Sequence, residues 1–391
     1  MNSQRHMKLR DVCELINGRA YKKSELLSRG KYPVLRVGNF FTNDHWYYSD
    51  LELNAKNYCD SGDLLYAWSA SFGPRIWQGG KVIFHYHIWK VVPRVDLIDQ
   101  RYLLYFFQWD VDRIKEDSGA GTTMLHVSKG SMEEREIPVP NLSEQGRIVA
   151  ILDEAFSGIA TAKANAEKSL RNSQEVFETH LQSSFSGRED DWSKKTLGEI
   201  ADFRNGINFT KASKGRQVRV LGVKDFQNNF HAPDAGLDRV TIDGNLDTSD
   251  FLQTGDIVFV RSNGNPELIG RSVVIEGMSE ETAHSGFTIR GRPRSKEVLP
   301  QYLGHFLKSS AVRRQMVDGG TGTNIKSLNQ GTLSRLVVPY PPRAEQLNIV
   351  DRLEEVQAET RHLASLYTRK LAALDDLKQS LLQRAFSGQL T

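Results

Sequence analysis

The chain contains two copies of one unit. The run Ser143-Glu144-Gln145-Gly146-Arg147-Ile148-Val149 returns as Ala344-Glu345-Gln346-Leu347-Asn348-Ile349-Val350, an offset of 201 residues. The same offset relates Phe185-Ser186-Gly187 to Phe386-Ser387-Gly388. A duplication of this length constrains the architecture before any single residue is interpreted, because both copies must fold into the same kind of unit.

Each copy contains one long helical segment. After each Pro-rich junction, apolar or small side chains recur in alternating steps of four and three, which is the spacing of a coiled-coil seam. The predicted seam residues are Ile148, Leu152, Ala155, Ile159, Ala162, Ala166, Ile349, Leu353, Val356, Leu363, Tyr367, Leu374, Leu377 and Leu381. Each helix should run for roughly 40 residues, about 60 Å. Two unrelated amphipathic helices remain the alternative, but the shared register favours antiparallel pairing with each other.

The rest of each copy predicts a mixed α/β domain. Each opens with a short apolar run and an Asn-Gly pair, Asn17-Gly18 and Asn205-Gly206. Each continues with a Gly-Asp pair, Gly62-Asp63 and Gly255-Asp256, followed by a short apolar run that reads as a buried strand. A short helix and a Gly/Thr loop complete the unit. The strands kept their order while the loops changed length, which is typical of divergence on a retained framework.

Composition limits the class of protein. The 391 residues suffice for two or three domains, and 39% hydrophobic with 25% charged residues is ordinary for a soluble protein. The net charge of +3 shows no overall basic excess, so any nucleic-acid binding depends on where Lys and Arg cluster. No apolar stretch is long enough for a membrane span, and the N-terminus lacks an apolar signal core. We therefore expect a cytoplasmic protein without a membrane partner.

These paired motifs, in this order and spacing, resemble the specificity subunit of type I restriction–modification systems over essentially the whole chain. The resemblance implies an α+β (mixed α/β) fold, with two pseudo-repeated target-recognition domains separated by two long helices that form an antiparallel coiled coil. The expected divisions are recognition domains at 1–141 and 188–341, and helical regions at 142–187 and 342–391. It also implies that the two chain ends lie near each other.

The resemblance further implies a function and partners. Each recognition domain would read one half of a bipartite site on double-stranded DNA. The helices would dock two adenine-N6 methyltransferase (modification) subunits, which restriction/translocase subunits would accompany. No cofactor is expected in this chain, because S-adenosylmethionine, ATP and Mg²⁺ would be used by the partner subunits. The first helix has Gly146 where the second has Leu347, so the two docking surfaces need not be equal.

Polar and basic loop residues are the candidates for DNA contact, because phosphates attract cations and base edges need forked or amide side chains. The candidates are Lys22, Lys23, Asn39, Ser69, Ser71, Arg75, Lys129, Lys211, Lys214, Arg216, Lys224, Gln227, Asn228, Arg261, Asn263, Asn265 and Lys326. The loops after the two Gly-Asp strands align but differ in chemistry, so Arg261 is a candidate reader of guanine and Asn263 of adenine. The alternative is that these residues only form solvated turns.

Other motifs favour structural roles. The Gly/Thr loops, Gly119-Ala120-Gly121-Thr122 and Gly320-Thr321-Gly322-Thr323, could bind phosphate through backbone amides, but neither matches the dinucleotide fingerprint, and a turn is favoured. His85 and His87 could ligate a metal from one strand face, but no third ligand has suitable spacing, so packing is favoured. No metal site is predicted.

No catalytic motif is present. The chain lacks a nucleotide-binding phosphate loop and the adenine pocket motif of amino-methyltransferases. We therefore expect a non-catalytic subunit that reads an asymmetric bipartite DNA site. The rivals are a coiled-coil protein–protein adaptor, which would show no salt-dependent DNA affinity, and a self-sufficient DNA enzyme, which would methylate or cut without partners.

Overall fold

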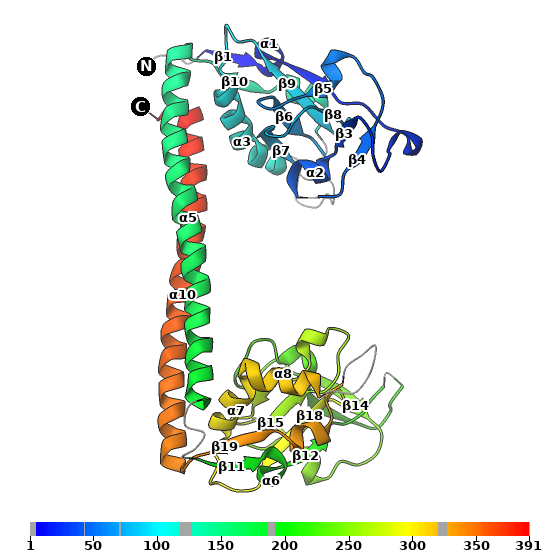
Figure 1. Ribbon diagram of the computed structural model, residues 1–391, viewed down its shortest axis with the longest axis vertical. Helices are drawn as coiled ribbons and strands as arrows, with labels where there is room; N and C mark the ends of the chain where they lie inside the picture. The colour runs from blue at the N-terminus through cyan, green and yellow to red at the C-terminus, as the bar shows by residue number, and fades with distance from the viewer. Residues whose placement is uncertain are drawn as a thin grey trace. The chain divides into compact units, whose positions relative to one another are not determined.

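The computed structural model describes residues 5–42, 44–69, 72–117, 127–186, 192–210, 212–319 and 327–390. The chain divides into two compact units. Unit 1 comprises Met1–Glu167 with Arg369–Thr391, and unit 2 comprises Lys168–Thr368. The two long helices, α5 (Leu142–Phe185) and α10 (Arg343–Phe386), each run through both units, so every unit holds one α/β domain, the first half of one helix and the second half of the other (Figure 1).

The domain of unit 1 is built on two four-stranded sheets. One has the order β2-β9-β6-β7 and is antiparallel, and the other has the order β4-β3-β8-β5 with β3 and β8 parallel. A separate pair, β1 with β10, closes the domain. The elements are β1 (His6–Lys8), α1 (Leu9–Val12), β2 (Cys13–Asn17), η1 (Lys23–Glu25), β3 (Tyr32–Leu35), α2 (Val37–Phe41), β4 (Tyr47–Ser49), η2 (Ala55–Asn57), β5 (Tyr58–Cys59), β6 (Leu64–Ala67), β7 (Gly73–Ile76), β8 (Val82–Phe84), β9 (Ile88–Pro93), α3 (Gln100–Asp117), α4 (Lys129–Glu133) and β10 (Glu136–Pro138).

The domain of unit 2 repeats this plan. Its sheets have the orders β12-β18-β15-β16 and β14-β13-β17, again with one parallel pair, and β11 with β19 closes it. The elements are β11 (Ser193–Thr196), α6 (Leu197–Ile200), β12 (Ala201–Asn205), β13 (Arg216–Leu221), η3 (Val223–Asp225), β14 (Asp238–Ile242), η4 (Thr248–Asp250), β15 (Ile257–Val260), η5 (Pro266–Leu268), β16 (Ser272–Val274), β17 (Thr282–His284), β18 (Thr288–Pro293), α7 (Pro300–Lys308), α8 (Ser310–Asp318), α9 (Gln330–Ser334) and β19 (Val337–Tyr340).

The apolar runs after the two Gly-Asp pairs form the central strands β6 and β15, which are buried on both faces. In β6, Leu64 and Tyr66 belong to the core that includes α3, whereas Leu65 belongs to a second core on the opposite face. In β15, Phe259 and Val258 divide in the same way between two cores. Successive side chains of a strand point to opposite faces, so a strand between two cores has no polar position, which explains the continuous apolar sequence.

The Gly-Asp pairs tie the turn before each central strand to the neighbouring strand. Gly62 and Gly255 have φ of +94° and +93°, a left-handed conformation that glycine adopts without a steric cost. The Asp63 carboxylate accepts a hydrogen bond from Lys90 Nζ at 2.6 Å. The equivalent Asp256 carboxylate accepts one from Arg292 Nε at 2.7 Å. The duplicated motif is therefore a structural device.

The glutamine side chain of each duplicated Glu-Gln motif is buried and binds backbone groups at the start of its long helix. Gln145 Oε1 accepts the Asp99 N–H at 2.8 Å, and its Nε2 donates to the carbonyls of Leu97 and Pro140. Gln346 repeats this pattern with Leu299 N–H, at 2.8 Å, and two carbonyls. Because a side-chain amide both donates and accepts, it satisfies buried backbone groups of both signs at the start of each long helix.

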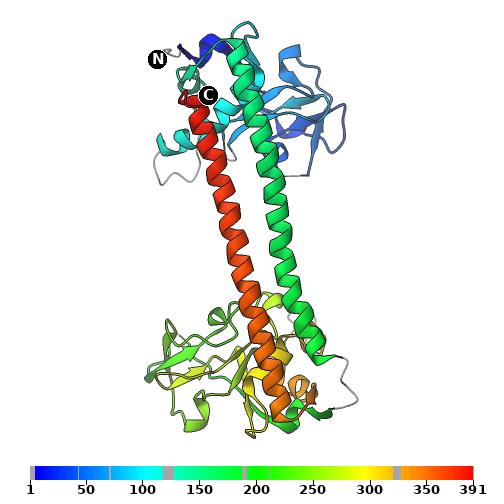
Figure 2. The ribbon, with the colours of Figure 1, turned by 90° about the vertical axis from the view of Figure 1, so that its left-hand side faces the viewer.

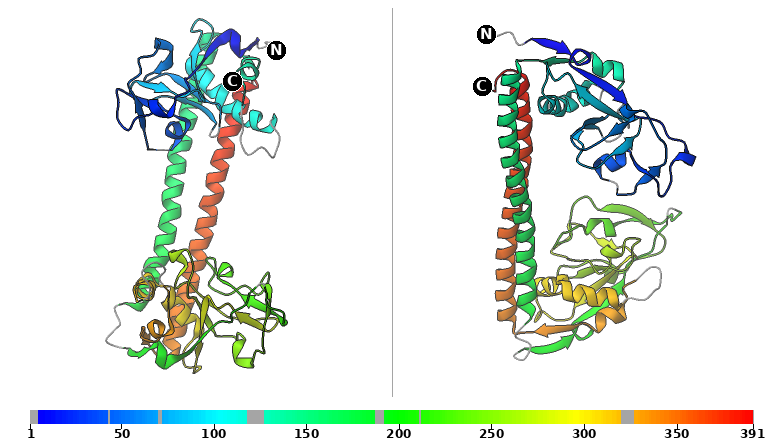
Figure 3. Two further views of the ribbon diagram at one scale, coloured as in Figure 1. Left: turned by 90° about the vertical axis from the view of Figure 1, so that its right-hand side faces the viewer. Right: turned by 45° about the horizontal axis from the view of Figure 1, so that its top comes forward.

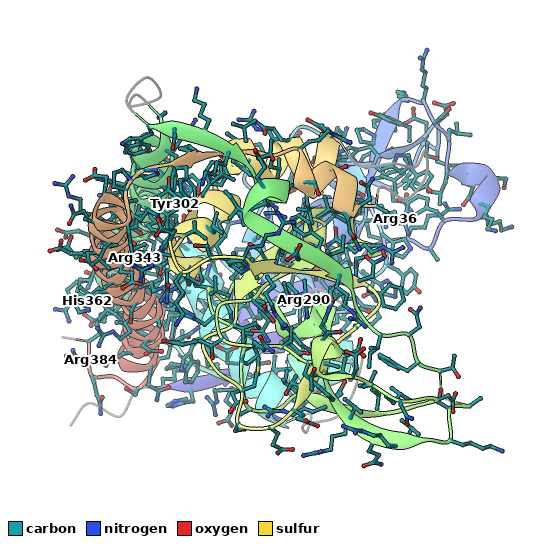
Figure 4. All side chains as sticks on the ribbon, turned by 90° about the horizontal axis from the view of Figure 1, so that it is seen from below. Arg36, Arg290, Tyr302, Arg343, His362 and Arg384 are labelled. Atoms are coloured by element: carbon teal, nitrogen blue, oxygen red, sulfur yellow. The ribbon has the colours of Figure 1, made fainter. Side chains whose placement is uncertain are left out.

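The phenylalanine of each Phe-Ser-Gly motif packs its helix end against the domain of the other copy. Phe386, at the end of α10, packs in unit 1 against Tyr102 at a ring distance of 5.2 Å, and Phe185, at the end of α5, packs in unit 2 against Tyr302 at 5.4 Å. Figure 4 shows Tyr302 on the side of its domain next to α10. Leu390 belongs to the same core as Leu9, so the two chain ends lie near each other in unit 1, as expected (Figure 3).

The long helices pair in antiparallel directions within each unit (Figure 2). In unit 1, Lys163 of α5 forms an ion pair with Asp375 of α10 at 2.6 Å. The predicted seam residues are mostly covered. Ile148, Leu152, Ile159, Ala166, Ile349 and Leu353 are buried, and Ala155, Ala162, Val356, Tyr367, Leu374 and Leu381 are half-buried.

Two predicted seam residues are corrected. Leu363 and Leu377 are 41% and 46% exposed. The covered positions of α10 are instead Ala364 and Lys378, one residue later. An α-helix has 3.6 residues per turn, so a strict 3.5-residue pattern drifts around a straight helix. From Thr360 the next covered position is four residues later, at Ala364, and this extra residue returns the covered positions to the same side of the helix. Among the helices of the described residues, none is long and apolar enough to span a bilayer.

Candidate nucleic-acid interface

In each domain, loops from distant parts of the sequence meet around one tight turn. In unit 1 this turn joins β8 to β9. Its Tyr86 N–H donates to Arg19 O at 3.1 Å, and its His87 O accepts the Trp68 N–H at 3.1 Å. Trp68 O in turn accepts the Val127 N–H. We call Arg19, Trp68, Ser69, Tyr86, His87 and Val127 loop cluster 1.

Unit 2 repeats these hydrogen bonds around the turn between β17 and β18. The Gly286 N–H donates to Ile207 O at 2.7 Å, and Phe287 O accepts the Arg261 N–H at 2.8 Å. Arg261 O accepts the Leu328 N–H at 2.9 Å. We call Ile207, Asn208, Arg261, Gly286, Phe287 and Leu328 loop cluster 2. The shared bonds show that both clusters rest on one backbone framework.

Glycine is required where the chain passes this turn. A Cβ on Gly18 would lie 2.3 Å from His85 O, and one on Gly206 would lie 2.1 Å from Ser285 O. No side chain fits at such distances. The Asn-Gly pairs of the sequence therefore mark the point, just after β2 or β12, where the backbone passes close to the turn.

The side chains on the common framework differ. Trp68 in loop cluster 1 corresponds to Arg261 in loop cluster 2, and Tyr86-His87 corresponds to Gly286-Phe287. Loop cluster 1 is therefore rich in aromatic rings. The ring centroids of Trp68 and His87 lie 5.0 Å apart, and those of Tyr86 and His87 lie 3.9 Å apart. In loop cluster 2, the Arg261 guanidinium donates to Gly286 O at 3.3 Å.

Two exposed aromatic residues stand at the turns. Phe287 is 62% exposed and Tyr86 is 38% exposed. An exposed ring on a turn held by several backbone hydrogen bonds can reach a ligand without loss of conformational freedom. Neither residue was predicted from the sequence. The available signal was a large apolar residue directly after Gly286, in a turn between two buried strands.

The histidine pair of loop cluster 1 packs as part of an aromatic group. Burial, with the nearby His87 and Arg36, lowers the pKa of His85 to about 4, so its ring is neutral at pH 7. The rings of His85 and His87 lie 5.0 Å apart in an edge-on arrangement. Across the described ranges, no three His, Cys, Asp or Glu side chains come together as metal ligands would.

Several predicted DNA-contact residues hold their own domain together. Arg75 donates to Phe40 O at 2.9 Å, and Asn39 donates to His45 O at 2.8 Å. The amide oxygens of Asn263 and Asn265 accept backbone N–H groups two residues later, which is the turn-forming role of asparagine. Ser69 is buried. These bonds leave less of each side chain for a ligand.

The remaining candidates are scattered. Lys129, Arg216 and Lys224 pair with Glu133, Glu281 and Asp238. Lys22, Lys23 and Lys214 are exposed. Gln227 and Asn228 line a hollow beside α10, together with Glu354 and Gln357. Ser71, Lys211, Lys326 and both Gly/Thr loops lie outside the described residues. Of the candidates that are described, only Ser69 and Arg261 lie in a loop cluster, and DNA contact by any candidate stays a prediction.

Comparison with known proteins identifies the family. The type I restriction modification DNA specificity domain matches residues 4–170 and, a second time, residues 189–366. The chain belongs to this family. It is 24% identical to the type I restriction enzyme StySPI specificity subunit of Salmonella potsdam, over 97% of this chain and 88% of that protein. It is 23% identical to the EcoBI specificity subunit of Escherichia coli, over 97% and 85%.

Solved structures of the family share the fold. The HsdS subunit from Thermoanaerobacter tengcongensis matches with a TM-score of 0.57 and 17% identity, over 100% of this chain and 98% of that chain. A chain from a structure that addresses complex assembly and conformational transition of the type I R-M system matches with a TM-score of 0.78 and 17% identity, over 99% and 98%. The predicted fold class, with two pseudo-repeated domains and two long paired helices, is confirmed.

Proposed function

We propose that this protein is the DNA sequence-recognition subunit of a type I restriction–modification complex and has no catalytic site of its own. The observation that carries this proposal is the pair of loop clusters, which combine one backbone framework with different side chains. A duplicated frame gives two readers of equal geometry. Different side chains on that frame give each reader its own base preference, so the target would be a bipartite site with two unlike halves.

The chemistry of the clusters suits base reading. Arg261 carries the forked donor that recognises guanine in the major groove, and Phe287 offers an apolar surface for the thymine methyl group. In loop cluster 1, Trp68 and Tyr86 supply amphipathic rings with a polar edge.

The partners would be two adenine-N6 methyltransferase subunits, together with restriction/translocase subunits. Leu347, Leu363 and Leu366 of α10 are exposed leucines, which a partner subunit would cover. S-adenosylmethionine, ATP and Mg²⁺ would be bound by those partners. Because α5 and α10 run through both units, their length would set the number of base pairs between the half-sites, since groove exposure repeats every ~10–10.5 base pairs.

Methylation mapping tests the proposal. Host DNA is sequenced for N6-methyladenine with and without the gene for this chain, in the presence of the methyltransferase gene. The expected result is the loss of one gapped motif with two unlike halves. A set of methylated motifs that does not change when the gene is removed would contradict the proposal. It would leave the protein–protein adaptor, which also predicts no salt-dependent DNA affinity.

A further inference from the structure

Four cations of unit 2 come together without forming an ion pair to any described residue, although Glu267 lies near enough to Arg313 to offset part of the repulsion there. They are Arg271 before β16, Lys308 at the end of α7, Arg313 in α8 and Arg361 in the middle of α10, and we call them the cation cluster. Among the described residues of this domain, seven other cations form ion pairs: Arg204–Asp250, Arg216–Glu281, Arg219–Asp234, Lys224–Asp238, Arg239–Glu280, Arg292–Asp256 and Arg294–Asp202. With the residues that the structure describes, the four members of the cluster form none.

Neutral groups hold the cluster in place. Lys308 Nζ donates to the carbonyls of Ser272 at 2.7 Å and Asn229 at 2.9 Å. Arg271 donates to Gln227 O at 2.8 Å and to the amide oxygen of Asn228. Arg313 donates to the carbonyl of Glu267. Carbonyl dipoles orient these side chains but do not neutralise their charge.

The four charges act on one another. Burial, together with the positive charges of Arg313, Arg271 and Arg361, lowers the pKa of Lys308 to about 8. No carboxylate offsets this effect. A bound anion would therefore remove a repulsion that is present in the free protein.

The cluster borders two hollows in the surface of unit 2. Arg361 lines one of about 820 Å³, together with Asn229 and His305. Lys308 and Arg313 line another of about 520 Å³. Lys308 connects the two, because its ammonium group bonds to Asn229 O. The nitrogen Nε2 of the buried His305 has no hydrogen-bond partner within the described structure.

The cluster adjoins the candidate reading loop. This loop leaves loop cluster 2 at Arg261 and ends at Arg271, whose N–H donates to Leu268 O at 3.1 Å. Arg313 holds the same loop through Glu267 O. The loop therefore has base-reading candidates at its start and unpaired cations at its end.

The cluster is a property of the second copy only. Val260 and Ala67 are the last residues of the equivalent strands β15 and β6. Arg271 bonds to Val260 and Gly73 pairs with Ala67, so Arg271 corresponds to Gly73. Lys308 corresponds to Gln108, counted from Tyr302 and Tyr102, and Arg361 corresponds to Ala160 at the helix offset. Three of the four cations thus have neutral counterparts in unit 1.

We propose that the cation cluster binds backbone phosphates of double-stranded DNA next to the half-site read by loop cluster 2. The inference rests on the proposed function. A loop that reads base edges is positioned by contacts to the phosphates that flank the groove, and such contacts come from unpaired Lys and Arg. At the hollow that Arg361 lines, a protein partner is the less favoured ligand, because the core of a protein interface is apolar, whereas amide and charged side chains dominate this lining. The hollow that Lys308 and Arg313 line exposes more apolar than polar surface and also holds the carboxylates Glu178, Glu267 and Asp318, so it does not distinguish the two ligands.

The test uses the full-length chain assembled with its methyltransferase subunits. Binding to a duplex that carries the mapped site, and to a scrambled duplex of equal length, is measured over a range of salt concentrations. We expect Arg313→Gln combined with Arg361→Gln to weaken binding to both duplexes by the same factor. The plot of log affinity against log salt should flatten by about 1 for each cation removed. The methylated motif of Arg361→Gln alone should not change, because Arg361 forms no hydrogen bond to the reading loop within the described structure.

Arg239→Gln is the matched control, because Arg239 is exposed in the same domain but is paired with Glu280. Arg361→Gln alone guards against misfolding, since Arg361 makes no hydrogen bond within the described structure. A salt slope equal to that of the control would overturn the inference. Loss of the methyltransferase subunits with an unchanged slope would also overturn it and assign the cluster to a protein partner. If the unaltered complex itself shows no salt-dependent binding, the proposed function fails, and the inference fails with it.

Discussion

At the residue scale, Phe287 has a backbone position shared with the other copy and a side chain that is its own. The backbone bonds on either side of it repeat those around His87 in the other copy, yet the ring is 62% exposed. Exposure of a large apolar side chain costs solubility and brings no stability, so its value lies in what it contacts. The same reasoning applies to Tyr86 in loop cluster 1.

Phe287→Ala should therefore alter recognition and leave stability nearly unchanged. We expect a relaxed preference at one position of the second half-site, equivalent to about 1–3 kcal/mol of lost discrimination, with the first half-site intact. Methylation mapping of the variant measures both halves at once. Val337→Ala, an exposed apolar residue of β19 in the same domain, is the control. Equal motifs for Phe287→Ala and the native protein would remove Phe287 from the reading surface.

His305 gives a prediction on pH. Burial, together with the charges of Lys308, His231 and Arg361, lowers its pKa to about 3. The unfolded chain has an ordinary histidine pKa of about 6.5, so between these values the unfolded state binds a proton that the folded state does not. Stability must therefore fall as the pH decreases below about 6.5.

His305→Tyr introduces the residue that unit 1 has at the equivalent position, Tyr105, and removes this proton. The dependence of unfolding free energy on pH should become shallower by up to about 1.4 kcal/mol per pH unit between pH 6 and pH 4. Urea unfolding at a series of pH values measures it. His362→Tyr, an exposed histidine of α10 labelled in Figure 4, should follow the native curve. Parallel curves for His305→Tyr and the native chain would contradict the assignment.

At the scale of elements, α10 has a covered face and an exposed face that both carry leucine. Leu382 is buried in the core of unit 1 with Leu152 and Phe386, whereas Leu377 is 46% exposed. Both residues belong to the same unit and the same helix. The pair therefore separates core packing from helix propensity.

Leu382→Ala should lower the free energy of unfolding by about 3 kcal/mol, because it leaves a cavity in a closed core. Leu377→Ala should cost less than about 1 kcal/mol, since alanine is the better helix former and little burial is lost. Denaturant unfolding of both variants checks the difference. Similar losses would mean that the seam follows the sequence heptads after all. If α10 docks a partner, Leu377→Ala should instead weaken assembly.

The sequence was most informative where the two copies agree. The duplicated Gln145 and Gln346 correctly marked the starts of the long helices, although two of the three hydrogen bonds of each could not be foreseen, because those partners lie more than forty residues away. The heptad pattern located the helices but misplaced Leu363 and Leu377, since the seam phase depends on accumulated helical twist. Among the reading candidates, Arg75 donates to Phe40 O, a bond that nothing local in the sequence reveals, and its contact with DNA stays a prediction. Phe287 was missed because polar residues alone were considered.

At the scale of the whole molecule, the ends of the second domain lie side by side. Ser193 of β11 pairs with Tyr340 of β19. In the sequence β11 is the first strand after α5, and α10 begins at Arg343, shortly after β19. A segment with adjacent ends can be exchanged without moving its neighbours. The equivalent pair in the first domain is His6 with Pro138.

Replacement of residues 193–340 by the corresponding segment of a relative should change the second half of the methylated motif and keep the first half and the spacing. Methylation mapping of the chimera reads out all three. The reciprocal exchange of residues 6–138 is the control and should change only the first half. A chimera that alters both halves would contradict independent reading by the two domains.

The exchange of helix ends has a consequence for how the protein is made. Phe386 and Leu390 complete the core of the first domain, but the ribosome adds them only after the entire second domain. Until then the emerging chain exposes Tyr102, Phe106 and Trp109, the rings that Phe386 covers. The domain that is synthesised first is thus completed last. We therefore expect this aromatic patch to stay open during translation until α10 has been made.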